Sequence, residues 1–177
     1  MEQVKKVKHD NFILIGMPGA GKSTVGVVLA KKLGYDFLDS DLLIQKETGK
    51  RLQELIEENG LDGFNAIENK INQSINVEKH VIATGGSAVY GAEAMAHLQE
   101  IGVVIYLKLS FDAVQKRVGN LKDRGVSMRI NQTLYDLYEE RVPLYEKYAE
   151  IIIDCEHMEL REVVDSIYTE MTIVSEM

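Results

Sequence analysis

The chain has 177 residues, 45% hydrophobic and 27% charged, as expected for a globular domain with a buried core. Its net charge of −8 excludes a general nucleic-acid binder, because such a surface needs a basic field to neutralise phosphates. The single cysteine, Cys155, has no partner for an internal disulfide, which fits a reducing cytosol. The polar residues 1–10 and the lack of any apolar stretch near ~18 residues argue against a signal peptide or a membrane span. We expect one cytoplasmic domain over residues 1–177.

The first predicted strand leads into a phosphate-binding loop. Residues 12–15 form a short apolar run, and Val25, Leu29 and Leu33 follow at helical spacing. Between them, residues 16–23 fit the pattern G-x-x-x-x-G-K-S/T at every fixed position. Its glycines let several backbone N–H groups point at one anion, Lys22 can reach the β- and γ-phosphates, and the Ser23 hydroxyl can ligate Mg²⁺. The start of the following helix also favours phosphate, so this segment predicts a nucleotide site.

The later elements alternate between strands and helices along the chain. After the first strand and the helix at 23–33, we predict a strand at 35–39, helices at 41–50, 51–59 and 63–77, and a strand at 80–83. A helix at 92–99, a strand at 103–109 and helices at 111–118 and 133–147 follow, with Pro143 as a bend or break. A strand at 151–153 and a helix at 159–170 complete the series. Apolar strands between amphipathic helices are typical of an α/β fold with a parallel sheet covered on both faces.

Two carboxylates follow the second predicted strand. In a parallel sheet the ligand lies at the carboxyl ends of the strands, which places Asp39 and Asp41 beside the phosphate loop. One of the two can hold the shell of a Mg²⁺ ion, while the other accepts a proton or hydrogen bond from an attacking alcohol. The alternative is that Asp39 or Asp41 only caps the next helix. The neighbouring phosphate loop favours the functional interpretation.

Several stretches, taken together, resemble the shikimate kinase family over about residues 10–170. They are the phosphate loop, residues 37–41, Thr48-Gly49, Gly63-Phe64 with Ile67-Glu68, Gly85-Gly86 before Ala88-Val89, Arg117, and the Arg-Val-Pro-Leu-Tyr segment at 141–145. A very large superfamily shares the phosphate loop. The Asp-x-Asp pair and the Arg-x-Pro-Leu-Tyr segment are more specific.

The resemblance implies a P-loop NTPase fold. It is a three-layer α/β/α sandwich around a five-stranded parallel sheet of nucleoside-monophosphate-kinase type, in the order 2-3-1-4-5. A mobile lid would cover about residues 119–132. The implied reaction moves the γ-phosphoryl group of ATP to a ring hydroxyl of shikimate, in aromatic amino-acid biosynthesis.

The resemblance also implies a nucleotide side of the site. The expected ATP contacts are Gly19, Ala20, Gly21, Lys22, Ser23 and Thr24. Arg117 would stack near adenine, and Ser23 with Asp39 would hold Mg²⁺. Lys22 would steady the transferring phosphoryl group.

On the acceptor side, the resemblance assigns roles to both glycines after the third strand. Gly85 and Gly86 would present backbone N–H groups to the acceptor, and Arg141 would pair with its carboxylate. Asp41 would bind the acceptor diol and take its proton. A lid arginine would complete the catalytic set of Lys22 and Asp41. It is Arg124 or Arg129, and we favour Arg124 because the glycine after it permits a mobile turn.

Two departures from the family lie on this acceptor side. Asn65 stands where the family usually carries an arginine that grips the shikimate carboxylate, and Ser87 replaces the third glycine of a usual triplet. Asparagine can form a hydrogen bond, but it lacks the positive charge of arginine and cannot bind a carboxylate through two parallel N–H groups. Arg51 or a lid arginine can compensate. Glu68, which in the family braces the missing arginine, is left to pair with Arg141 or with an acceptor hydroxyl.

Three functions remain open at this stage. The first is a shikimate kinase, and the second is a similar kinase acting on a different small polyol or sugar acid. The third, a non-catalytic ATP-binding regulator, predicts loss of Lys22, Asp41 or Arg141, and all three are present. We expect ATP and Mg²⁺ as cofactors, a small hydroxylated acceptor, a monomer, and no nucleic-acid or membrane partner.

Overall fold

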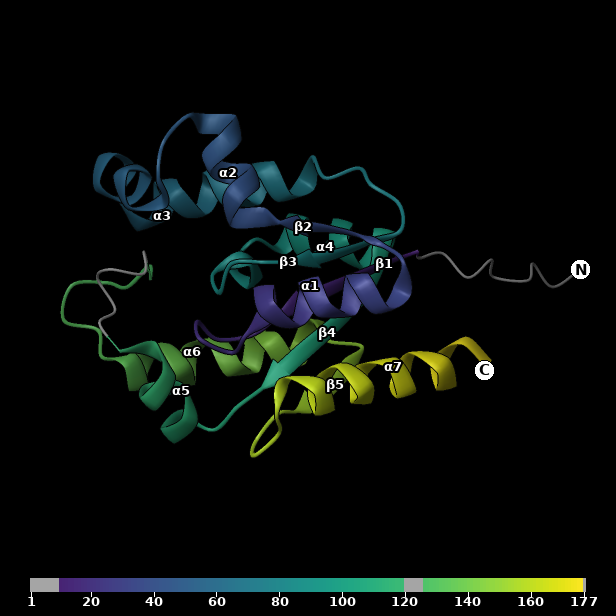
Figure 1. Cartoon of the computed structure of the whole chain (residues 1–177). Helices are drawn as coiled ribbons and strands as arrows, with labels where there is room; N and C mark the ends of the chain where they lie inside the picture. Colours follow the sequence, from purple (N-terminus) through teal and green to yellow (C-terminus); the bar gives the residue numbers. More distant parts are fainter. Residues whose placement is uncertain (1–9, 120–125, 177) are drawn as a thin grey trace, which may run out of the picture.

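The computed structural model describes residues 10–119 and 126–176. Its strands are β1 (Asn11–Ile15), β2 (Asp36–Asp39), β3 (His80–Ala83), β4 (Gly102–Lys108) and β5 (Ile151–Asp154). They form one parallel sheet in the order β2-β3-β1-β4-β5 (Figure 1). The predicted α/β class and strand order are therefore confirmed.

Helices cover both faces of this sheet. They are α1 (Lys22–Leu33), α2 (Ser40–Thr48), α3 (Leu52–Gln73), α4 (Ala92–Ile101), α5 (Phe111–Val118), α6 (Leu134–Tyr148) and α7 (Leu160–Glu176), with a 3₁₀ turn, η1 (Ala88–Tyr90). Helices α1 and α7 pack together on one face, and α4 and α6 pack on β4 from the other (Figure 1). The result is the predicted three-layer sandwich. None of the helices in the described ranges combines the length and apolarity that a membrane crossing requires.

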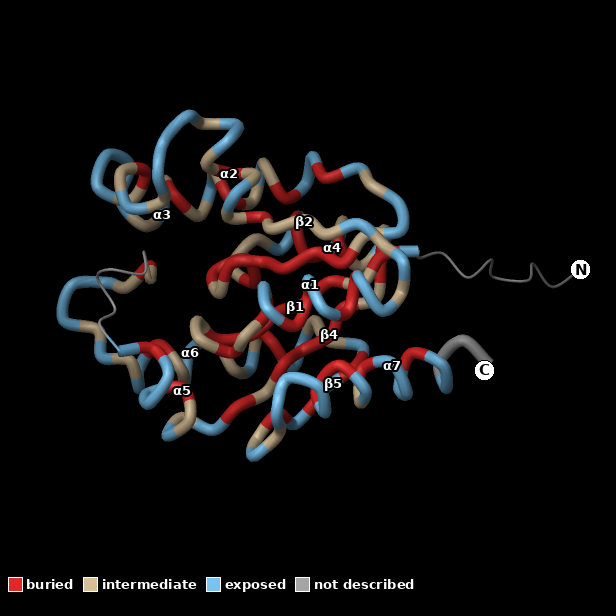
Figure 2. Tube along the Cα trace, in the orientation of Figure 1, coloured by how far each residue is buried: buried red, intermediate tan, exposed pale blue. Residues whose placement is uncertain are grey.

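The central strands are buried on both faces, as their continuous apolar sequences predict. In β1, Ile13, Leu14 and Ile15 are fully buried, and Figure 2 shows the buried sheet between more exposed helices. The Asn11 side chain aligns the starts of these strands. Its Nδ2 donates to the carbonyls of Val77 (2.7 Å) and Ile101 (2.8 Å), and its Oδ1 accepts from the His80 N–H (2.9 Å). The carboxyl ends of the strands are thereby held in register for the site.

Helix α3 contains the predicted break between two helical stretches as a kink within one element. Its ladder runs from Leu52 to Gln73, but Gly60 interrupts it with φ 69° and ψ 178°, a conformation that favours glycine. The gap predicted between the helices at 51–59 and 63–77 thus corresponds to the kink at Gly60. Beyond the kink, Phe64 packs with Ile44 and Leu55 in a small second core between α2 and α3. This packing fixes the part of α3 that carries Glu68.

Candidate active site

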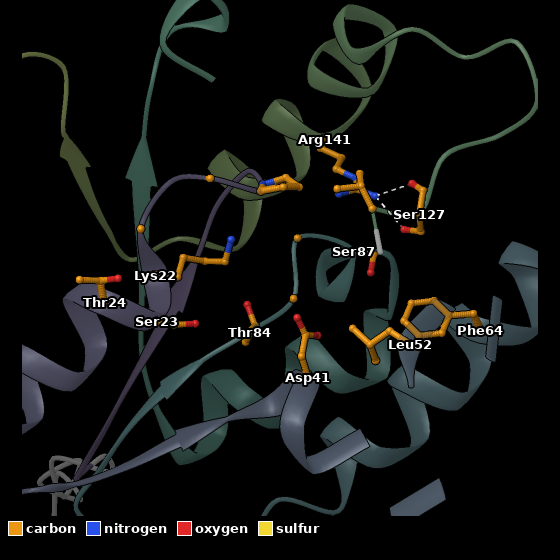
Figure 3. Close-up of a pocket in the computed structure, with 16 residues that line it drawn as sticks. Lys22, Ser23, Thr24, Asp41, Leu52, Phe64, Thr84, Ser87, Ser127 and Arg141 are labelled. Carbon is orange, nitrogen blue, oxygen red and sulfur yellow. Dashed lines mark hydrogen bonds between the residues drawn. The ribbon is translucent and has the colours of Figure 1, made fainter. Parts of the chain in front are cut away.

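A cavity of about 270 Å³ lies at the carboxyl ends of the central strands (Figure 3). Its wall consists of Pro18, Gly19, Gly21, Lys22, Ser23, Thr24, Asp41, Leu52, Phe64, Thr84, Gly85, Gly86, Ser87, Val126, Ser127 and Arg141. The structure therefore brings together most of the residues that the sequence assigned to the nucleotide and acceptor sides. Ala20 is buried within the loop, where its N–H donates to the Met17 carbonyl (3.1 Å), and it is absent from the cavity wall.

The phosphate loop depends on glycine at three positions. Gly16, Gly19 and Gly21 have φ values of 151°, 79° and 88°, which side chains rarely allow. Gly21 is the N-cap of α1, so the loop delivers the chain directly to the helix N-terminus. Inside the loop, Lys22 Nζ donates to the carbonyls of Gly16 (2.8 Å) and Met17 (2.9 Å). Burial lowers the pKa of Lys22 to about 8, although the Asp41 carboxylate opposes this shift.

Asp39 caps the next helix with one carboxylate oxygen and leaves the other to face the phosphate loop, so the two interpretations in the sequence analysis are compatible. Its Oδ1 accepts hydrogen bonds from the N–H groups of Asp41 (3.0 Å) and Leu42 (3.3 Å), which caps α2. Its Oδ2 accepts from the Ser23 hydroxyl at 2.8 Å. The cap therefore holds the second carboxylate oxygen beside Ser23, at the edge of the phosphate loop.

Ser23 and Asp39 form an oxygen donor pair that suits Mg²⁺. In the described residues, no group of three or more His, Cys, Asp or Glu side chains is placed to hold a metal ion. This fits Mg²⁺, which is usually bound through one or two protein oxygens together with substrate phosphates and water. The pair matches that pattern because it lies next to the loop that would hold the phosphates.

Asp41 projects into the cavity from the first turn of α2 (Figure 3). Burial raises its pKa to about 6, the neighbouring Asp39 carboxylate adds to the shift, and Lys22 opposes it. Such a carboxylate is ionised at neutral pH yet basic enough to accept a proton. Its approach depends on Gly85, because a Cβ there would lie 2.6 Å from Asp41 Oδ1.

Glu68 is buried behind the same glycine. It is only 2% exposed, and its Oε1 would lie 2.9 Å from a Cβ on Gly85. Burial raises its pKa to about 7, while the hydrogen bond from Ser87 opposes that shift. That bond, from Ser87 Oγ to Glu68 Oε2, is 2.6 Å long. Of the two partners expected for Glu68, Arg141 is not its hydrogen-bond partner in the described residues, since Arg141 donates to Tyr90 and Ser127 instead. The other oxygen of Glu68, Oε1, has no hydrogen-bond partner in the described residues, and the pairing of Glu68 with an acceptor hydroxyl stays a prediction.

Gly85 also differs from its expected role. Its N–H donates to the buried Ser40 hydroxyl at 3.3 Å, so it is already used within the protein. Gly86 is fixed instead through its carbonyl, which accepts from the Tyr145 hydroxyl at 2.6 Å. Besides these backbone hydrogen bonds, the two glycines leave room for neighbouring site side chains: Asp41 and Glu68 at Gly85, and Arg141 at Gly86.

Arg141 is a buried cation on the cavity wall, only 1% exposed. Its Nη2 donates to the carbonyl and the hydroxyl of Ser127, both at 3.0 Å (Figure 3). Its Nε donates to the Tyr90 hydroxyl at 3.2 Å, and the guanidinium lies 5.3 Å from the centre of the Tyr90 ring. All its hydrogen-bond partners in the described part of the chain are neutral, which leaves the buried positive charge for an anionic ligand.

The comparison with known proteins decides the family. A family model described as shikimate kinase matches residues 18–172. The chain belongs to the shikimate kinase family. A shikimate kinase of Thermodesulfovibrio yellowstonii is 37% identical over 163 residues, which cover 90% of this chain and 94% of that protein. A shikimate kinase of Alteromonas mediterranea is 37% identical over 164 residues, covering 91% and 96%.

Solved structures agree with this assignment to the shikimate kinase family. The shikimate kinase of Acinetobacter baumannii in complex with shikimate superimposes with a TM-score of 0.83 at 34% identity, covering 94% of each chain. A deoxyadenosine kinase of M. mycoides, at 16% identity and a TM-score of 0.59, shares the fold alone. Membership in this kinase family establishes the protein as an ATP-using enzyme.

Of the two predicted departures from the shikimate kinase family, Ser87 lies on the wall of the main cavity and Asn65 lies beside it. Asn65 is half-buried and faces a second cavity of about 40 Å³, together with Tyr90, Ser127 and Arg129. Its Oδ1 is buried without a hydrogen-bond partner in the described residues. Asn65 is thus one residue away from the wall formed by Phe64 and is not part of it.

Of the remaining predicted site residues, the structure describes Arg117 and Arg129 but not Arg124. Arg117 is exposed on α5, and its Cβ lies 3.3 Å from where a Cβ on Gly19 would be, so it stands beside the phosphate loop. Arg129 is exposed, and its N–H donates to Gln132 Oε1 at 3.1 Å. Arg124 and residues 120–125 of the predicted lid lie outside the described residues.

Ser127 and Tyr90 are site residues that the sequence analysis missed. They orient Arg141 from positions 14 and 51 residues away in the chain. Neither follows a motif spacing. The one signal available was their closeness to predicted site segments, since Tyr90 follows the glycine pair and Ser127 lies in the predicted lid.

Proposed function

We propose that this protein transfers the γ-phosphoryl group of ATP to a ring hydroxyl of shikimate. The proposal rests on one observation: the phosphate loop, the Asp41 carboxylate and the buried Arg141 guanidinium face one cavity. The phosphate loop would bind the phosphates and Arg141 would bind an anionic group of the acceptor. Asp41 faces the same cavity and can accept a proton from the acceptor hydroxyl. The family membership and the shikimate-bound Acinetobacter relative support shikimate as the acceptor.

The nucleotide side supplies positioning and charge neutralisation, which carry most of the catalysis in phosphoryl transfer. Backbone N–H groups of the loop and the N-terminus of α1 would bind the phosphates. The Lys22 ammonium now donates to two loop carbonyls, and phosphate oxygens would be stronger, charge-assisted partners. Ser23 and Asp39 would hold Mg²⁺, which neutralises charge on the β- and γ-phosphates when bound.

The acceptor side supplies orientation and a base. Arg141 would pair with the shikimate carboxylate and fix one end of the ring. Asp41 would accept the hydrogen bond of the attacking hydroxyl and take its proton as the bond to phosphorus forms. A lid arginine, Arg124 by our expectation, would close over the phosphates and exclude water, which otherwise competes as acceptor.

A coupled ADP-release assay tests the proposal with shikimate and with a panel of other small polyols and sugar acids. Turnover of shikimate that Lys22→Ala abolishes is the expected result. No turnover of shikimate at millimolar concentration would reject it, and turnover of another acid in the panel would identify the alternative kinase. Binding of ATP without turnover of any acceptor would indicate a regulator. We further propose a monomer, as expected from the family, and light scattering measures this directly.

A further inference from the structure

Ser87 and Glu68 form a pair on the acceptor side of the cavity. Ser87 lies on the cavity wall, at the turn between β3 and η1. Glu68 comes from α3, is 2% exposed and is absent from the wall. The hydrogen bond of 2.6 Å between them places the serine between the carboxylate and the cavity. An acceptor molecule in the cavity would therefore contact the serine hydroxyl, and the hydrogen bond to Glu68 sets the orientation of that hydroxyl.

The hydroxyl of Ser87 has one proton and two lone pairs. Its proton is donated to Glu68 Oε2, and the length of 2.6 Å is typical of a bond to an ionised carboxylate. The hydroxyl can then offer only lone pairs to the cavity. It can accept a hydrogen bond from a ligand hydroxyl, but it has no proton to give to a ligand carboxylate.

The groups around Glu68 act on its charge in both directions. Asp41 Oδ1 and Glu68 Oε1 both crowd the Cβ side of Gly85, each under 3 Å from the position that a Cβ would take there. Burial raises the pKa of Glu68 and the Asp41 charge adds to this shift, whereas the hydrogen bond from Ser87 and the charges of Arg141 and Lys22 favour the ionised form that accepts the serine proton. Asp41 and Ser87 therefore line this part of the cavity with hydrogen-bond acceptors, while Arg141 provides a cation on the same wall.

We infer that Ser87 is a specificity-determining residue, whose hydroxyl accepts a hydrogen bond from an acceptor hydroxyl that is not phosphorylated. Glu68 is the positioning residue that keeps this hydroxyl turned to accept. The inference rests on the proposed function and deepens it. The ligand class is a ring that carries a carboxylate for Arg141, one hydroxyl for phosphoryl transfer and a second hydroxyl for Ser87.

The test compares kcat/KM for shikimate with kcat/KM for analogues that each lack one ring hydroxyl other than the phosphorylated one. The unaltered enzyme should discriminate against one of these analogues on the order of 10-fold. Ser87→Ala should lower kcat/KM for shikimate to about the value for this analogue, so that the ratio of the two kcat/KM values comes close to one. The KM for ATP should be unchanged. Ser87→Cys, which keeps the shape of the side chain with a larger atom that accepts hydrogen bonds weakly, should act in the same direction and serves if Ser87→Ala lowers the melting temperature.

Glu68→Gln tests the orientation itself. The amide can donate to Ser87 and so free the serine proton to point at the cavity. The discrimination should then be lost although the hydroxyl remains, which a purely structural role of Glu68 would not produce.

Thr84→Val is the matched control, because the Thr84 hydroxyl also lies on the wall and donates its proton, to the Leu14 carbonyl at 2.9 Å. It should leave the ratio as it is. The inference would be overturned if both Ser87 variants kept the ratio of kcat/KM values of the unaltered enzyme, or if only Thr84→Val brought that ratio close to one. In either case the turnover of shikimate, and with it the proposed function, would be unaffected. Absence of shikimate turnover in the unaltered enzyme would reject the proposed function, and the inference with it.

Discussion

Substitution of Gly85 by alanine perturbs the Asp41 carboxylate, the proposed base, with a single added carbon. Gly85 does not require glycine for its backbone conformation, so the effect of alanine is steric. The new Cβ would lie 2.6 Å from Asp41 Oδ1 and 2.9 Å from Glu68 Oε1. Both oxygens belong to buried or half-buried side chains of helices that pack on one another, so they have little room to move.

The size of the effect follows from these distances. An ordinary contact begins at 3.4 Å, so the Asp41 oxygen must retreat by about 0.8 Å. A misplacement of about 1 Å in a catalytic arrangement can lower the rate on the order of 100-fold, or about 2.7 kcal/mol in activation free energy. We therefore expect Gly85→Ala to lower kcat by roughly 50- to 100-fold. The KM for ATP should change little, because the phosphate loop is untouched.

Gly86→Ala is the matched variant for the acceptor end. Its Cβ would lie 2.9 Å from Arg141 Nη1 and 3.0 Å from Pro18 Cδ, and it would leave Asp41 in place. It should raise the KM for shikimate more than it lowers kcat, since it displaces the group that binds the carboxylate. Steady-state kinetics with both substrates, together with melting curves, separate these effects from loss of folding. If Gly85→Ala is folded and keeps kcat within about twofold, the position of Asp41 does not limit the rate, and the proposed role of Asp41 is refuted.

Three further predictions concern pH, metal and packing. In the proposed mechanism Asp41 acts ionised and Lys22 acts charged, so kcat/KM should fall below about pH 6 and above about pH 8; a flat profile across pH 5–9 would contradict both roles. Asp39→Asn keeps an oxygen for the helix cap but loses the charge beside Ser23, so the Mg²⁺ concentration for half-maximal rate should rise roughly tenfold with little change in melting temperature. Gly26→Ala would place a Cβ 2.5 Å from the Phe37 ring, and urea unfolding should show a loss of about 1–3 kcal/mol, while activity per folded molecule is kept.

The features that the sequence predicts well are those set by neighbouring residues. The phosphate loop is one, because its glycines, lysine and serine act within eight consecutive positions, 16–23. The strands are another, since short apolar runs such as residues 80–83 have few alternatives to a buried strand. The order of the strands came from the family resemblance, and local patterns alone would not have provided it.

The contacts around Arg141 and Glu68 could not be predicted in the same way. Each is made between segments whose distance in space depends on the completed fold, as with Tyr90 and Arg141. The sequence analysis identified Asn65 and Ser87 as departures from the family resemblance, and it treated them as two separate losses on the acceptor side. In the structure they have different consequences, since Asn65 faces the smaller cavity while Ser87 bonds to Glu68.

The partner of Glu68 determines what the acceptor wall can recognise. A buried carboxylate without a hydrogen-bond donor would be costly, and the Ser87 hydroxyl supplies that donor at one oxygen. The same hydrogen bond uses the only proton of the serine hydroxyl. The bond that stabilises Glu68 therefore also leaves the hydroxyl able only to accept a hydrogen bond from the ligand. A side chain with donors but no lone pairs at this place would offer only donors to the cavity. The identity of one wall residue therefore decides whether this part of the site favours the hydroxyls or the carboxylate of its substrate.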